Sequence, residues 1–144
     1  MKSCFMLAGG LTLALLAGCN QSPKSSRGFR LPDGDVKKGK QAFLALKCNQ
    51  CHKVEGVELP APGSFNLTLG GETQRVRTYG ELVTSIINPS HVISDQYQKE
   101  LADAKESPMP RFNHEMTVEQ MIDLVAFLQS RYKLVEPPYE PTLP

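Results

Sequence analysis

Small and apolar residues recur at helical spacing over residues 35–47. They lie three or four positions apart, which places them on one face of a helix. These positions are Val36, Gly39, Phe43 and Leu46. Asp33 or Asp35 can cap the first turn, because a carboxylate accepts hydrogen bonds from the free backbone amides there. The pattern predicts a helix that leads directly into residues 47–53, KCNQCHK.

A second helix is predicted after Thr78. Thr78 and Glu81 have the spacing of a capping box, in which side chains and backbone amides at a helix start bond reciprocally. Pro89 is expected to stop this helix, because proline cannot continue the backbone hydrogen bonds. Its predicted apolar face comprises Leu82, Val83, Ile86 and Ile87.

The most strongly patterned helix is predicted after Thr117. Thr117 and Gln120 form another capping box, and Pro137 and Pro138 are expected to end the helix. Its predicted apolar stripe comprises Val118, Met121, Ile122, Val125, Leu128 and Tyr132.

The remaining segments show no sustained period. Residues 55–71 are rich in Gly and Pro and predict a loop, with a short hairpin as an option because Leu67 and Leu69 alternate with polar residues. Residues 90–113 are expected to be mostly irregular, with one helical turn around 97–105. Residues 137–144 are expected to form a loose tail.

The N-terminal segment is not expected to belong to the folded domain. Lys2 and the apolar run that follows are typical of a signal peptide, and the run is too short to span a bilayer. It ends in LAGC at residues 16–19, which resembles the lipobox of bacterial lipoproteins. That resemblance implies a signal peptide at 1–18 and an acylated Cys19; an ordinary secretory signal or an uncleaved anchor are the alternatives. Residues 19–34 would form a flexible tether.

Composition fits one small domain. The chain has 144 residues, of which 40% are apolar and 22% are charged. Its formal charge of +1 gives no field of one sign, so no nucleic-acid partner is expected. Trp is absent and aromatic residues are few, so a core of protein side chains alone would be modest. A domain of this size gains stability from a bound cofactor.

Cys48, Cys51 and His52 form a Cys-x-x-Cys-His sequence after the first predicted helix. A thioredoxin-like site would follow a strand, and a structural zinc site needs four ligands. His91 and His114 do not complete a familiar zinc spacing. The pattern is the attachment signature of c-type haem, in which both thiols bond to the porphyrin and the histidine binds iron. One covalent haem c is therefore predicted, with a disulfide or another metal as alternatives.

Residues 35–132 resemble the class I cytochromes c, and the domain of this type is expected to span residues 35–136. Three stretches carry the resemblance: GKQAFLALKCNQCH, SPMPRF and MTVEQMIDLVAFLQSRY. In that family the first and last helices cross at a glycine contact with aromatic packing, and Gly39, Phe43 and Phe127 match those positions. The resemblance implies an all-α, cytochrome c-like fold, with three to five helices around one covalently bound haem.

The sixth iron ligand has several candidates. Met109 lies between two prolines that hold the backbone extended, and the resembling family places its ligand in such a loop. Met116 is an alternative, although it can also pack on Met121 as a hydrophobic staple. His91 would give a bis-histidine haem of lower potential, but His91 and His114 are expected to be surface residues. Weaker candidates, for pairing with the haem propionates, are Tyr79, Tyr97, Arg75 and Arg77.

These features predict a one-electron carrier tethered to a bacterial membrane, with the domain facing the periplasm or the cell exterior. Its partners would be a redox donor and a redox acceptor, with no catalytic residues and no small-molecule substrate. One alternative is a cytochrome subunit of a particular dehydrogenase or oxidase. Another is a haem sensor or enzyme with an open or bis-histidine distal site.

Overall fold

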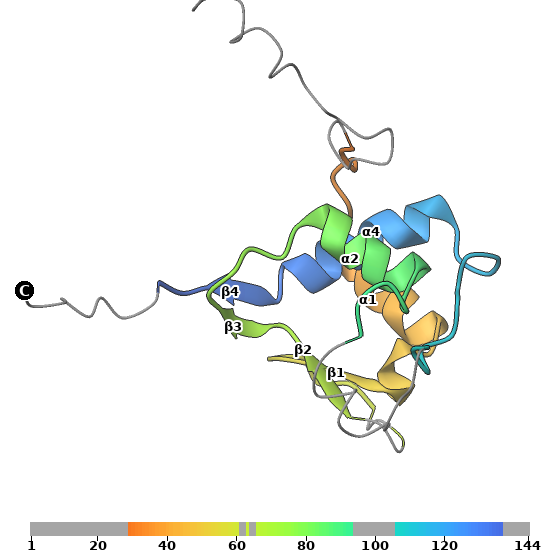
Figure 1. The fold of residues 1–144 in the computed structure, drawn as a ribbon, viewed down its shortest axis with the longest axis horizontal. Helices are drawn as coiled ribbons and strands as arrows, with labels where there is room; N and C mark the ends of the chain where they lie inside the picture. Colours follow the sequence, from red (N-terminus) through yellow and green to blue (C-terminus); the bar gives the residue numbers. More distant parts are fainter. Residues whose placement is uncertain (1–28, 61–62, 64–65, 94–105, 137–144) are drawn as a thin grey trace, which may run out of the picture.

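The computed structural model describes residues 29–60, 63, 66–93 and 106–136. In chain order the elements are α1 (Val36–Ala45), the short 3-10 helix η1 (Cys48–Gln50), β1 (His52–Val54), β2 (Leu67–Leu69), β3 (Gly71–Thr73), α2 (Tyr79–Ile87), α4 (Val118–Gln129) and β4 (Tyr132–Leu134). Helices α1 and α2 both pack on α4, and the strands lie to one side of the helices (Figure 1). None of the described helices is long and apolar enough to cross a membrane.

The start of α1 is fixed by Asp35. Its side chain accepts hydrogen bonds from the backbone amides of Lys37 at 2.7 Å and Lys38 at 3.1 Å. These bonds favour the ionised carboxylate and so lower the pKa of Asp35. Helix α1 ends at Ala45, close to the predicted end at residue 47, so the first predicted helix is confirmed.

Both predicted capping boxes are confirmed. The Thr78 amide donates to Glu81 Oε2 at 2.9 Å, and the Glu81 amide donates to Thr78 Oγ1 at 3.2 Å. Thr117 and Gln120 make the same reciprocal pair at the start of α4. Helix α2 stops at Ile87, before Pro89, and it buries three of its four predicted apolar residues. Ile87 is the exception at 37% exposed, so the prediction that it faces the core is wrong.

The predicted end of the last helix is wrong. Helix α4 ends at Gln129, and Tyr132 begins β4 instead of continuing the helical stripe towards Pro137. Strand β4 runs parallel to β3, with Tyr132 opposite Gly71. Gly70 and Gly71 have φ angles of +90° and +85°, which favour glycine, and they let β3 approach closely enough for the Gly71 amide to bond to the Arg131 carbonyl oxygen at 2.9 Å.

The expectation of a purely helical domain needs a correction. Two parallel strand pairs, β1 with β2 and β3 with β4, accompany the three α-helices in the described part of the chain. The alternation at Leu67 and Leu69 belongs to β2, which lies in parallel register with β1 instead of forming a hairpin. Each strand has only three residues, and its partner lies elsewhere in the sequence, so local patterning carries little information about it.

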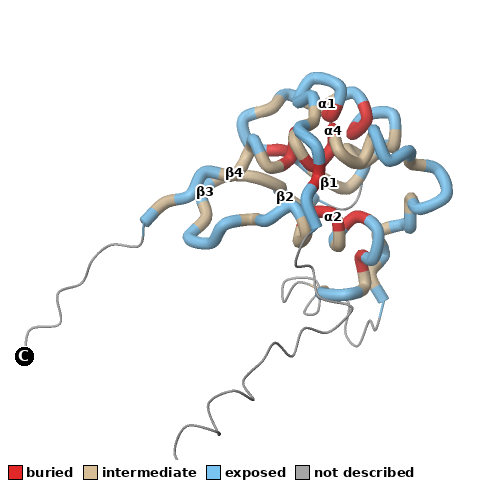
Figure 2. The backbone as a smooth tube through the Cα atoms, turned by 90° about the horizontal axis from the view of Figure 1, so that it is seen from above, coloured by how far each residue is buried: buried red, intermediate tan, exposed pale blue. Residues whose placement is uncertain are grey.

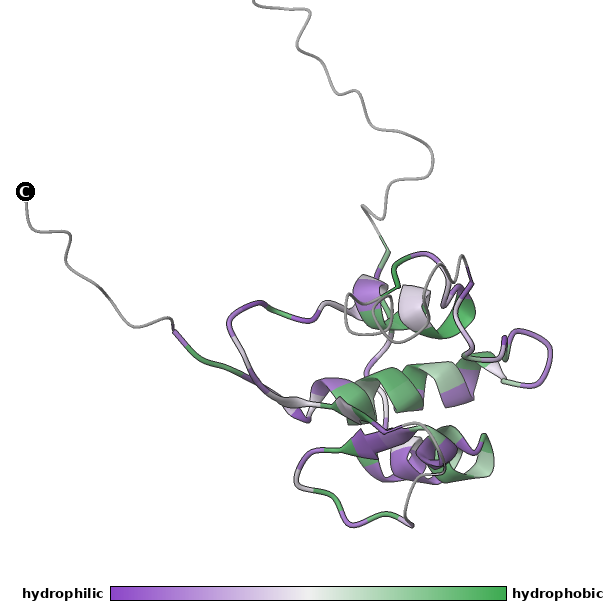
Figure 3. Cartoon of the chain, turned by 60° about the horizontal axis from the view of Figure 1, so that its bottom comes forward, coloured by the Kyte–Doolittle hydropathy of each residue, from purple (hydrophilic) through white to green (hydrophobic). Residues whose placement is uncertain are grey.

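The core lies where α1 crosses α4. Phe43 and Phe127 are 1% and 2% exposed, and their rings meet edge to face with centroids 5.8 Å apart. Buried residues concentrate on the helices (Figure 2), and the helices carry hydrophobic stretches (Figure 3). Gly39 makes the close approach possible, because a Cβ atom there would overlap the Asp123 carbonyl group and lie 2.6 Å from Phe127 Cβ.

Two contacts extend this core towards the N-terminus. The buried Asp123 carboxylate on α4 accepts a hydrogen bond from the Asp35 backbone amide at 2.7 Å. Leu31 is also buried in the core, so packing begins within the segment 19–34 that was expected to be a tether. The expected signal segment 1–18, the helical turn around 97–105 and the tail 137–144 lie outside the described residues.

The glycine contact can be tested by substitution. Gly39→Ala should lower the free energy of unfolding by about 1–3 kcal/mol, because the new methyl group would collide with the α4 backbone. The measurement is chemical denaturation of the purified protein. Gly80→Ala is the matched control: a Cβ atom there meets nothing within 4 Å, so helix propensity should raise stability by about 0.5–1 kcal/mol. Equal effects of the two substitutions would contradict the crossing described above.

Candidate functional site

The two cysteines lie on one tight turn after α1. Lys47 adopts a left-handed conformation with φ of 57°, which turns the chain from α1 into η1. The Cys51 amide then donates to the Cys48 carbonyl oxygen at 3.2 Å. Residues three apart in a 3-10 turn lie on the same side, so the two side chains leave the turn together. Both thiols are free and half-buried.

His52 follows immediately as the first residue of β1. The pairing of β1 with β2 holds it in place, with His52 opposite Leu67 and the Leu67 amide bonded to the Cys51 carbonyl oxygen at 3.0 Å. Its Nδ1 atom is buried and has no hydrogen-bond partner among the described residues. Burial lowers the pKa of His52, while the backbone of Leu67 acts in the opposite direction.

These residues fit the chemistry of a covalently bound haem. Burial raises the pKa of the Cys48 thiol to about 11, so this sulfur is a neutral thiol near neutral pH rather than a thiolate. Beside it lie a second free thiol and an imidazole with an unengaged buried nitrogen. Two thiols can form thioether bonds to a porphyrin, and a neutral imidazole can bind iron. Among the residues that the structure describes, no group of three or more His, Cys, Asp or Glu side chains could hold a metal ion on its own.

Met109 lies in the loop that precedes α4. It is half-buried, and its amide donates to Ser107 Oγ at 3.2 Å. The Ser107 amide in turn donates to Ser90 Oγ at 3.1 Å, which ties this loop to the chain just after the buried Pro89. The methionine therefore lies on a segment that is anchored next to the end of α2.

Comparison with known protein families gives a direct result. A sequence model of the family described as Cytochrome c matches residues 36–131, which is more than half of the chain. The chain belongs to the cytochrome c family. Members of this family carry covalently bound haem c and transfer electrons, and Cys48 and Cys51 fit its attachment motif. No curated protein and no solved structure matches the chain.

The alternative ligands of this cytochrome c, Met116 and His91, differ in their surroundings, as do Met121 and His114. Met116 and Met121 are partly buried, and both pack against the hydrophobic core. His91 and His114 are exposed, as expected for surface histidines. Of these four side chains, the two methionines already have packing roles and the two histidines face solvent.

The residues that were predicted to pair with the haem propionates also differ in exposure and in their partners. Arg75 pairs with Glu81 at 2.7 Å and its side chain is 67% exposed, while Tyr79 is exposed as well. Arg77 is half-buried, and its guanidinium lies 5.9 Å from the centroid of the Tyr132 ring. Tyr97 lies outside the described residues.

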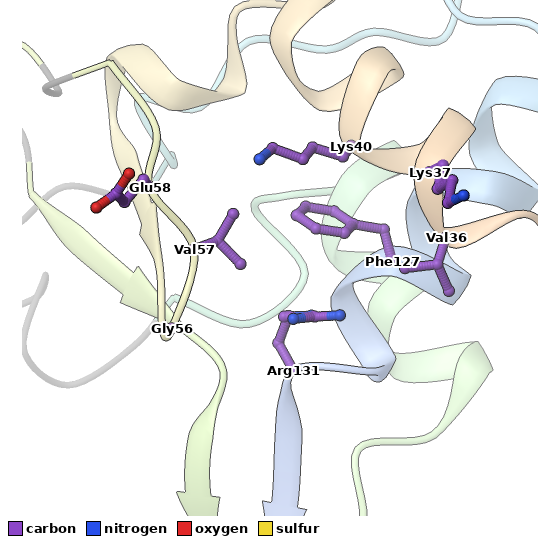
Figure 4. A pocket seen from close by; sticks show the side chains of 8 residues that line it. All are labelled: Val36, Lys37, Lys40, Gly56, Val57, Glu58, Phe127 and Arg131. Atoms are coloured by element: carbon purple, nitrogen blue, oxygen red, sulfur yellow. The ribbon is translucent and has the colours of Figure 1, made fainter.

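Sequence reasoning missed a pocket between α1, residues 56–58 and the end of α4. Figure 4 shows this pocket of about 400 Å³, with Phe127 between Lys40 and Arg131. The Arg131 guanidinium lies 5.7 Å from the centroid of the Phe127 ring. None of Cys48, Cys51 and His52 lines the pocket, so it is separate from the attachment turn. The sequence places the lysines together on α1, but it does not show that Arg131 lies beside them. That proximity arises only because α1 crosses α4 in the fold.

Proposed function

We propose that this cytochrome c is a class I, one-electron carrier in which Cys48 and Cys51 bind the haem and His52 is the proximal iron ligand. The bound haem supplies an iron that accepts and releases one electron. The single observation that carries the assignment is the attachment turn: two free thiols three residues apart, followed directly by a half-buried histidine whose buried Nδ1 atom has no hydrogen-bond partner among the described residues.

The protein's own residues orient and shield this centre. The β1–β2 pairing fixes the backbone of His52 opposite Leu67. Burial lowers the pKa of His52, which favours the neutral imidazole, and a neutral imidazole has a nitrogen lone pair for iron. Cys48 packs against the hydrophobic core, so this side of the attachment turn lies against apolar side chains. A dry apolar surrounding is one of the factors that set a haem's reduction potential.

Met109 is the proposed distal ligand. It is half-buried and lies on a loop anchored through Ser107 and Ser90, whereas Met116 packs against the core and His91 faces solvent. A thioether ligand raises the reduction potential relative to a second imidazole. It also closes the sixth position, which suits an electron carrier better than a haem sensor or an enzyme with an open site.

The membrane tether is proposed from the sequence LAGC at residues 16–19. Cytochrome c domains are typically exported, which agrees with a signal peptide over 1–18. Acylation of Cys19 would hold the domain at a bacterial membrane, facing the periplasm or the cell exterior, where its partners would be a redox donor and a redox acceptor.

The attachment site is tested by replacing both thiols. Cys48→Ser together with Cys51→Ser should abolish covalent haem, because serine cannot form the thioether bonds. The measurement is haem staining after denaturing electrophoresis, with the intact mass as a second readout. A haem-stained band of unchanged intensity in the double variant would refute the proposed attachment.

The distal ligand is tested by the optical spectrum of the ferric protein. Met109→Ala should remove the weak long-wavelength band that a sulfur-to-iron bond produces, and Met109→His should lower the reduction potential. Met116→Ala is the matched control and should retain the band, because Met116 packs on the core. If only Met116→Ala removes the band, the assignment passes to Met116.

The tether is tested by fractionation of cells. Cys19→Ala should move the protein from the membrane fraction to the soluble fraction, because the acylated residue is lost. Cys4→Ala should leave it in the membrane fraction, since Cys4 lies within the proposed signal peptide. Membrane retention of the Cys19→Ala protein would show that something other than a lipid on Cys19 holds it.

A further inference from the structure

Arg77 has no carboxylate partner among the described residues. Its Nε atom is buried and has no hydrogen-bond partner among the described residues. No described carboxylate lies within ion-pair distance of its guanidinium. A buried N–H group without an acceptor is costly, so a native fold normally provides one.

The position of Arg77 is fixed by the end of α4. Gln129 Nε2 donates to the Arg77 carbonyl oxygen at 3.1 Å, and the ring of Tyr132 faces the guanidinium at 5.9 Å. Arg77 also directly precedes Thr78, the N-cap of α2. Backbone and side chain are thus held from a distant part of the chain, which is more constraint than a solvated surface arginine needs.

Glu81, a carboxylate whose charge interacts with Arg77, is already paired with other groups. Glu81 pairs with Arg75 at 2.7 Å and accepts the Thr78 amide at 2.9 Å. Arg75 therefore pairs with a carboxylate and is largely exposed to solvent. Arg77, two residues later, is half-buried and pairs with no described carboxylate. The two arginines look alike in sequence but differ in burial and pairing.

We propose that Arg77 is a positioning residue that binds a propionate of haem c. This inference rests on the proposed function, because the acceptor is one of the two carboxylates that the cofactor brings into the domain. A planar guanidinium forms strong, directional hydrogen bonds to a carboxylate, and Nε takes part in the bidentate form. The proposal supplies an acceptor for the unpartnered Nε atom and explains why the chain fixes Arg77 so firmly.

The pairing has a consequence for the redox reaction. A cation next to a propionate offsets negative charge near the iron, and this favours the reduced state. It also keeps that propionate ionised over a wider pH range. Removal of the cation should therefore lower the reduction potential and move a propionate titration upward into the range near neutral pH.

The experiment compares three variants of the purified holoprotein by redox titration between pH 5 and 8. Arg77→Met keeps the apolar stem against Tyr132 but removes the charge, and it should decrease the equilibrium constant for reduction roughly threefold to tenfold. Its potential should also become pH-dependent within this range. Arg77→Lys retains a cation and should remain close to the wild type, as should the matched control Arg75→Met.

The outcomes separate the two proposals. If Arg77→Met has the potential and pH dependence of the wild type, or if Arg75→Met shifts them equally, the propionate assignment is overturned while the haem assignment stands. If the wild-type protein carries no covalent haem, the proposed function itself fails.

Arg77→His replaces Arg77→Met if the latter does not accumulate as folded holoprotein. Histidine gains its charge between pH 8 and 5, so the loss in potential should appear at pH 8 and shrink at pH 5. A difference from the wild type that stays constant over this range would also overturn the assignment.

Discussion

The close crossing of α1 and α4 is the constraint on which the rest of the structure depends. Gly39 lets the two backbones meet, and Phe43 and Phe127 fill the space beside the contact. Asp123 adds a directional bond at the same crossing, because its carboxylate accepts the amide of the N-cap residue Asp35. Apolar packing alone would permit several angles between the helices, whereas the glycine contact and the buried carboxylate together restrict α1 to one position on α4.

That position determines where the functional residues emerge. Helix α1 ends at Ala45, the left-handed Lys47 redirects the chain, and the thiols of Cys48 and Cys51 follow within one turn. Helix α2 packs on α4 as well, so α4 is the common support for both other helices. Without Trp and with few aromatic residues, this support is a modest core. A bound haem would enlarge it, which is why attachment of the cofactor and stability of the fold are expected to be linked.

The sequence predicted those parts of the fold that local chemistry controls. Capping side chains and apolar spacing located the starts of α1, α2 and α4, and the Cys-x-x-Cys-His pattern located the attachment turn. It failed where a distant segment decides the outcome. Helix α4 ends early because β4 pairs with β3 beside Gly70 and Gly71, and β2 pairs with β1. No local pattern distinguishes Arg75 from Arg77 either, since the difference in exposure, with Arg75 exposed and Arg77 half-buried, arises only in the folded chain.

The unpartnered polar atoms point to the same cofactor as the motif does. Asp123 is a buried charged residue, but α1 supplies a donor for it, so it has a structural role within the protein. In the described part of the chain, His52 Nδ1 and Arg77 Nε are the two buried side-chain nitrogen or oxygen atoms without a partner. The first belongs to a metal-binding side chain and the second to a carboxylate-binding one. Haem c contains both an iron and two propionates, so a single bound molecule offers partners to both residues, whereas a zinc ion would offer none to Arg77 and a disulfide none to either.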